Sequence, residues 1–266
     1  MAKSKALVAL VADIHNGSVA VHRGVPQKLG PYAVELLAGF VGEMNGEAHP
    51  DVVVQLGDAI EDADILADSV NYHAVMETLD CLDAPHYNVI GNHDRAHIPE
   101  GELLGLAGLE RTYYSFTHGP YRFIVLDTAL DAAYRPTVSA EQLSWLEEEL
   151  SSSDADTVVL SHACLADQDL SGNVWFSGWE EGALVSNRAA VREALRLGNV
   201  RAAFCGHVHR DRMDVQDGIP YFSLQSLVEN ARGDGVPSGA YALVSIDEDT
   251  ISVSVMGIDP VEFSYP

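Results

Sequence analysis

Five short apolar runs in this chain each end in a polar cluster, and this repeated arrangement is the feature that most constrains the fold. The runs lie at residues 6–12, 52–56, 86–90, 157–160 and 202–205. Segments with helical spacing of apolar residues lie between them, at residues 32–44, 70–82, 139–150 and 187–197. Strand-like runs that alternate with helices predict a layered α/β fold.

The middle and the end of the chain depart from this alternation. Residues 112–117 and 121–127 are predicted to pair as a hairpin. Further strands that alternate in hydropathy, with glycine-containing turns, are predicted at residues 212–215, 219–222, 240–246 and 251–256. We therefore expect two packed mixed β-sheets flanked by helices. Because we find no internal repeat, low-complexity tract or linker, we expect residues 1–266 to form a single domain.

The charge balance limits the partners of the protein. The 266 residues include 40 Asp and Glu but only 15 Lys and Arg, which gives a formal net charge of −25. A surface with this much negative charge repels nucleic-acid backbones and anionic membranes. Broad binding to either is therefore not expected. The only lysines are Lys3, Lys5 and Lys28. An acid excess with so little lysine fits a salt-adapted surface and an ordinary acidic protein about equally well.

Cysteine usage and apolar run length bear on the location of the protein. Cys81, Cys164 and Cys205 show no CxxC spacing, which argues against a disulfide scaffold and fits a reducing compartment. No apolar run approaches the ~20 residues that a membrane helix needs. The first run ends in Asp13 without a cleavage-site pattern, so we interpret it as a strand and not as a secretion signal. We therefore expect a cytoplasmic protein.

The polar clusters carry side chains that bind divalent cations. They are Asp13-Ile14-His15, Gly57-Asp58, Gly91-Asn92-His93-Asp94, Ser161-His162 and Gly206-His207-Val208-His209. Open α/β sheets bind ligands beyond the carboxyl ends of their strands, where these clusters lie. Carboxylate, imidazole and amide groups suit Mn, Fe, Zn or Co, and one aspartate can bridge two such ions. A single cluster of this kind is more often a turn or a solvated strand end, but five in order predict a two-metal site.

The clusters resemble the motifs of the calcineurin-like metallophosphoesterases, with matching blocks from residue 13 to residue 209. The resemblance implies a four-layer α/β sandwich with a dinuclear metal centre. It also implies two sets of metal ligands joined by a bridging aspartate: Asp13, His15 and His209; Asn92, His162 and His207; and Asp58 between them.

His93 matches the catalytic histidine of that family, which lies beside the metals without binding them. The resemblance implies that His93 stabilises the transition state or protonates the leaving oxygen. Two cations would neutralise the phosphate oxygens and activate a bridging water as the attacking hydroxide. For Asp94 two roles are open: it orients His93, or it serves as a turn or helix cap.

Departures from subfamily patterns narrow the expected substrate. Residues 57–63 lack the arginine of the GDxxDRG block of protein Ser/Thr phosphatases, and Glu61 stands where purple acid phosphatases have a tyrosine. The GNHD ending and the compact length look more like class III cyclic-nucleotide phosphodiesterases and related small phosphodiesterases. We therefore expect hydrolysis of small, nucleotide-like phosphodiesters. A phosphomonoesterase is the nearer alternative, and a non-catalytic scaffold with this fold is the more remote one.

Substrate contacts must come from the loops. Arg23 is a candidate for phosphate binding, although surface charge balance explains it more simply. Trp175 is a candidate for stacking a nucleobase, although packing within its own loop is an equally ordinary role. His97, close to Asp94, is a candidate for facing the cleft. The expected partner is a small phosphoester, and the exposed edges of the C-terminal strands leave room for a homodimer.

Overall fold

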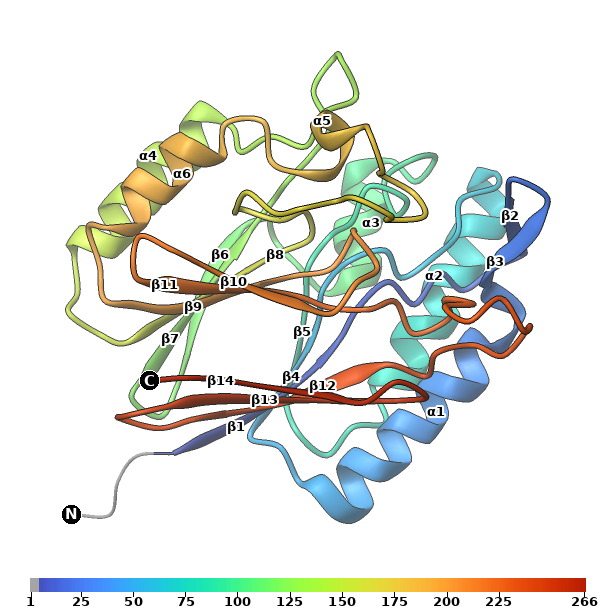
Figure 1. Ribbon diagram of the computed structural model, residues 1–266, viewed down its shortest axis with the longest axis horizontal. Helices are drawn as coiled ribbons and strands as arrows, with labels where there is room; N and C mark the ends of the chain where they lie inside the picture. Colours follow the sequence, from blue (N-terminus) through green and yellow to red (C-terminus); the bar gives the residue numbers. More distant parts are fainter. Residues whose placement is uncertain (1–4) are drawn as a thin grey trace.

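Two β-sheets lie face to face at the centre of the computed structural model, which describes residues 5–266 (Figure 1). The first sheet contains β1 (Ala6–Val11), β4 (Val52–Gln55), β5 (His86–Asn88), β12 (Tyr241–Ile246), β13 (Ile251–Met256) and β14 (Val261–Tyr265). The second contains β6 (Tyr114–His118), β7 (Tyr121–Leu126), β8 (Thr157–Ser161), β9 (Val200–Cys205), β10 (Arg212–Gln216) and β11 (Ile219–Ser223). Both sheets are mixed, as the sequence predicts.

The order of the strands explains why the polar clusters meet. The first sheet has the order β14-β13-β12-β1-β4-β5, and the second has the order β10-β11-β9-β8-β7-β6. The strands β1, β4 and β5 are parallel to one another, and so are β7, β8, β9 and β11. Parallel neighbours end at the same edge of a sheet, so the clusters that follow β1, β4, β8 and β9 are brought together there.

Helices cover the outer face of each sheet and complete four layers (Figure 1). The first sheet is covered by α1 (Ala33–Glu43), α2 (Ile65–Leu79) and α3 (Glu100–Ala107). The second is covered by α4 (Ala140–Ser151) and α6 (Arg188–Leu195). Short helices complete the set: a 3₁₀ turn at Gly30–Tyr32, a π-helical turn at Met44–Ala48, and α5 (Glu180–Ala183). We propose that these layers form the single expected domain; residues 1–4 of that span lie outside the described residues.

The core explains the continuous apolar runs of the central strands. In β1, Val8 and Leu10 pack between the two sheets, whereas Ala9 and Val11 pack against the helices. Both faces of the strand are therefore buried, so apolar residues do not alternate with polar ones. By contrast, β14 has alternating burial, as expected for an edge strand with one face in solvent.

Several elements differ from the sequence-based expectation. Residues 19–29, for which no strand was predicted, form a hairpin of β2 (Val19–His22) and β3 (Val25–Leu29). The helix α2 begins at Ile65, because the Asp64 side chain caps it by accepting from the next amides. The elements α3 and β14 were not predicted. These segments lie at the surface, where little apolar periodicity marks them.

One disulfide joins two central strands of the second sheet. Cys164 lies just after β8, Cys205 ends β9, and their sulfur atoms are 2.08 Å apart. Both residues are buried, whereas Cys81 is free and exposed. The cysteine pattern did not predict this bond, because the two residues are 41 positions apart and only the sheet brings them together. Among residues 5–266 no helix has the length and apolar character needed to cross a membrane.

Candidate dinuclear metal centre

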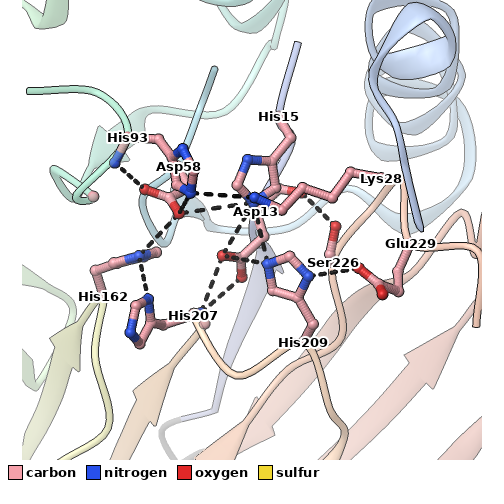
Figure 2. A network of polar contacts seen from close by, with 12 residues as sticks. Asp13, His15, Lys28, Asp58, His93, His162, His207, His209, Ser226 and Glu229 are labelled. Atoms are coloured by element: carbon pink, nitrogen blue, oxygen red, sulfur yellow. Dashed lines mark hydrogen bonds and ion pairs between the residues drawn. The ribbon is translucent and has the colours of Figure 1, made fainter. Parts of the chain in front are cut away.

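The five polar clusters meet at one edge of the two sheets, where backbone hydrogen bonds fix the loops to one another (Figure 2). The amide of Asp13 donates to the carbonyl of Gly57 at 3.1 Å, which joins the loops after β1 and β4. The amide of Gly206 donates to the carbonyl of His162 at 3.0 Å, which joins the loops after β8 and β9. The positions of the side chains therefore follow from the sheet register.

One group of donors comes from the loops after β1 and β9, and we call Asp13, His15 and His209 the first donor set. Their candidate ligand atoms all lie within 4.8 Å of one another. Nε2 of His209 is 3.2 Å from Oδ1 of Asp13 and 3.1 Å from Nε2 of His15. All three side chains are buried.

A second group lies on the other side of Asp58, and we call Asn92, His162 and His207 the second donor set. Nε2 of His162 is 3.2 Å from Oδ1 of Asn92 and 3.1 Å from Nδ1 of His207. Oδ2 of Asp58 is 3.2 Å from Nε2 of His162 and 3.7 Å from Nε2 of His15. The Asp58 carboxylate therefore lies between the two sets, as a bridging ligand would (Figure 2).

Outer partners determine which ring nitrogen of each histidine faces inward. In the first donor set, Nδ1 of His209 donates to Glu229 at 2.6 Å, and Nδ1 of His15 lies 3.0 Å from Oε2 of Glu61. Both histidines therefore present Nε2 to the centre.

Backbone carbonyls play the same part in the second donor set. Nδ1 of His162 donates to the carbonyl of Leu56 at 3.0 Å, and Nε2 of His207 donates to the carbonyl of Gly182 at 2.9 Å. His162 therefore presents Nε2 to the centre, and His207 presents Nδ1.

These orientations make the donor sets fit cations. Once the outer nitrogens of His15 and His209 carry protons, lone pairs on their inner nitrogens face each other and the Asp13 carboxylate. Buried lone pairs this close repel one another unless a cation or a proton lies between them. Imidazole, carboxylate and amide oxygen are ligands for borderline divalent ions. The residues present therefore fit a pair of such ions.

Burial and charge shift the pKa values of the two donor-set histidines His209 and His207 in opposite directions. Burial lowers the pKa of His209, but the carboxylates of Asp13 and Glu229 raise it, to about 9. Burial and the neighbouring His162 lower the pKa of His207 to about 3. A cation competes with a proton for the inner nitrogen of His209, so metal binding there is expected to release a proton, whereas the inner nitrogen of His207 has none to release near neutral pH.

The backbone at the centre is held in an uncommon conformation. Asp13, His15, Asp58, His207 and His209 all have φ between 45° and 67°, in the left-handed region. Non-glycine residues rarely adopt this region, and such strain concentrates at functional sites.

Close approach of the loops also requires glycine. A Cβ atom at Gly91 would overlap the Asp58 carboxylate, and one at Gly206 would overlap the Asp13 carboxylate. Only glycine, which lacks a Cβ atom, lets the loops approach this closely at these two positions.

The structure corrects one role proposed for Asp94. Its carboxylate does not orient His93 but accepts hydrogen bonds from the backbone amides of residues 58, 59, 60 and 91. It therefore holds the turn, which was the alternative interpretation. The carboxylate that contacts Nδ1 of His93 belongs to Asp62. In the GNHD pattern Asp94 directly follows His93, which suggests that the two side chains interact. The Asp94 side chain instead contacts the backbone amides named above.

The candidate substrate residues lie in different places. Trp175 lines a pocket of about 320 Å³ beside the donor sets, together with Asp58 and His93. Arg23 lies in the exposed turn between β2 and β3. His97 pairs with Asp68 at 2.8 Å. Neither Arg23 nor His97 is part of the pocket lining.

Four charged residues at the centre were not proposed from the sequence. Lys28 and Glu61 line the pocket, while Asp62 and Glu229 contact His93 and His209. Glu61 and Asp62 come soon after Asp58, so this acidic run was a usable signal. No local motif marks Lys28 or Glu229, which lie far along the chain from their histidine partners.

The comparisons with known proteins place the chain in a family. Residues 6–211 match the family model described as calcineurin-like phosphoesterase. A manganese-dependent ADP-ribose/CDP-alcohol diphosphatase of Oryza sativa is 28% identical over 56% of this chain and 50% of its own length. A cAMP/cGMP dual specificity phosphodiesterase of Mycobacterium tuberculosis is 29% identical over 78% of this chain and 66% of its own length. The matches thus span about half to two thirds of these relatives.

A solved structure shows the same fold across the chain. A dimetal phosphatase from Danio rerio superposes with a TM-score of 0.77 at 20% identity, covering 98% of this chain and 99% of its own. At this identity the likeness shows the fold alone, which is the four-layer sandwich described above.

Proposed function

Because the chain belongs to the calcineurin-like phosphoesterase family, we propose that it hydrolyses phosphodiester bonds of small, nucleotide-like substrates with the help of two divalent metal ions. The observation that carries this proposal is the convergence of both donor sets on the Asp58 carboxylate beside a pocket of about 320 Å³. The relatives that act on cyclic nucleotides and on ADP-ribose support the nucleotide-like substrate class.

We assign each side chain a role on this basis. Asp13, His15 and His209 would hold one ion, Asn92, His162 and His207 would hold the other, and Asp58 would bridge them. The ions, drawn from Mn, Fe, Zn or Co, would neutralise phosphoryl oxygens and activate a water molecule. The outer carboxylates and carbonyls hold the outer nitrogens of the histidines, so that the inner nitrogens face the centre.

His93 lies where it can meet the phosphoryl group without being a ligand. Its amide donates to Oδ1 of Asp58 at 2.9 Å, and its Nε2 lies 3.9 Å from Oδ2 of the same carboxylate. Asp62 holds the ring through Nδ1. We therefore infer that His93 stabilises charge on the reacting ester and that Asp62 positions it.

The shape of the pocket favours a diester. Asp58, His93 and Lys28 line it, and so does an aromatic wall formed by Trp175 and Trp179. A phosphomonoester needs room for one organic group only, whereas this aromatic wall offers contact area for a second, base-like group.

The test compares two esters on protein loaded with manganese. We expect faster turnover of bis-p-nitrophenyl phosphate than of p-nitrophenyl phosphate, and His93→Ala should keep two metal equivalents while losing most of this turnover. Faster monoester turnover would reverse the substrate assignment. Absence of hydrolysis of either ester with Mn, Fe, Zn or Co would point instead to a scaffold.

A further inference from the structure

Lys28 brings a buried ammonium group into the candidate centre from the β2–β3 hairpin. Its side chain is only 6% exposed, although lysine is one of the most strongly hydrated residues. It is also one of only three lysines in a chain with a net charge of −25. Burying an ammonium group costs several kcal/mol unless partners compensate, so its position needs an explanation.

The partners of Lys28 hold it at the side of the pocket next to His93. Nζ donates to Oε2 of Glu61 at 2.9 Å and to Nε2 of His93 at 3.2 Å, and it lies 4.9 Å from the ring centroid of Trp175. An ammonium has three N–H donors, and these two acceptors leave a third N–H for a ligand in the pocket that Lys28 lines.

The hydrogen-bond geometry allows a neutral His93 ring to accept from the Lys28 ammonium. Because Nδ1 of His93 donates to Asp62, its Nε2 acts as the acceptor for Lys28. Nε2 of His93 lies 3.9 Å from the Asp58 carboxylate, and Lys28 adjoins this nitrogen. A phosphoester bound in the pocket beside Asp58 and His93 would therefore lie within reach of the Lys28 ammonium.

We propose that Lys28 is a catalytic residue whose ammonium group donates a hydrogen bond to the leaving-group oxygen and stabilises the charge that develops there. This inference rests on the proposed function. A water molecule gives up one proton to solvent as its oxygen bonds to phosphorus, the ester P–O bond breaks, and the electron pair of that bond stays on the leaving oxygen. That oxygen takes its proton from solvent after departure, so Lys28 keeps its own protons throughout.

The test uses leaving groups of graded quality. Methyl aryl phosphodiesters whose ring carries a nitro, chloro or methyl substituent are assayed with the wild-type protein and with Lys28→Met. A nitrophenolate spreads its own charge, so we expect a loss in kcat/KM of less than about 10-fold with the nitro ester. With the substrate whose aryl ring carries a methyl group, we expect a loss in kcat/KM of about 100-fold or more, which is the scale of removing one preorganised hydrogen-bond donor.

Two further variants separate this role from a structural one. Lys28→Arg keeps the positive charge, so its kcat/KM with the methyl-substituted aryl substrate should be at least tenfold higher than that of Lys28→Met. Lys5→Met removes a lysine that is exposed, and its rates should match those of the wild type. Elemental analysis should find two metal equivalents in every variant, and melting temperatures should stay within a few degrees of the wild-type value.

The outcomes are distinct. An equal loss across the three esters, no loss, or loss of bound metal in Lys28→Met would overturn the role of Lys28. If the wild-type protein hydrolyses none of the three esters, it is the proposed function itself that fails.

Discussion

The histidines of the two donor sets have different outer partners. In the first donor set, the carboxylates of Glu61 and Glu229 face the outer nitrogens of His15 and His209, at 3.0 and 2.6 Å. In the second donor set, carbonyl oxygens of the main chain accept from His162 and His207, at 3.0 and 2.9 Å. A carboxylate raises the basicity of an imidazole through its charge, whereas a neutral carbonyl mainly fixes its orientation.

This difference indicates which parts of the structure position the side chains in each half of the centre. The first donor set depends on side chains that single substitutions can alter. The second depends on the positions of β8 and β9, whose ends are joined by the disulfide. Cys164 lies two residues after His162, and Cys205 lies two residues before His207. The disulfide therefore supports the second donor set, as the two glutamates support the first.

The largest effect is expected from deleting one imidazole in each set. His209→Ala and His207→Ala should each bind one metal equivalent where the unaltered protein binds two, because each variant loses a ligand of one ion only. Elemental analysis after gel filtration measures this directly. If both variants keep two equivalents, or both lose all metal, the division into two independently held sets is wrong.

Removing the disulfide should affect stability and, among the two ions, mainly the one bound by the second donor set. Cys164→Ala/Cys205→Ala should lower the free energy of unfolding by about 2–4 kcal/mol, as expected for a closed loop of this size. In a His209→Ala background, it should also weaken binding of the remaining ion. Denaturant melts and metal titrations test both effects, and Cys81→Ala, at the exposed free cysteine, is the control. Unchanged metal affinity would show that the sheet alone positions these loops.

A smaller effect is expected from removing one outer charge. Glu229→Gln keeps an oxygen that can accept from His209 but loses the negative charge, so affinity for the first ion should fall about 10–100-fold. Competition with a chelator measures the dissociation constants. Glu248→Gln, at an exposed glutamate, should leave both constants unchanged. An equal weakening of both ions by Glu229→Gln would contradict the proposed asymmetry.

The sequence predicts the central strands, and it marks the inner side chains as a candidate site, because both are local signals. Each inner cluster comes directly after a run that is buried on both faces, and the run and the cluster are adjacent in the chain. The two mixed sheets are predicted by the same pattern. The hairpin formed by β2 and β3 was missed because its strands are short and contain no continuous apolar run, and Val19, Val21 and Val25 are exposed.

The outer side chains could not be predicted because only the tertiary structure brings them to their partners. Lys28 meets His93 across 65 positions, and Glu229 meets His209 across 20. Adjacency was misleading for Asp94, which lies next to His93 in the chain but binds backbone amides. Position in the chain thus identifies the side chains at the end of a strand, but not the side chains that pack behind them.

The left-handed backbone at five of the inner residues has a consequence for the order of assembly. A disordered chain seldom visits such conformations at even one non-glycine position, so it almost never displays several of them together. The unfolded chain should therefore bind the ions poorly, whereas the folded protein is expected to bind them. Ion loading should come last in maturation, after the sheets have closed and fixed the loops.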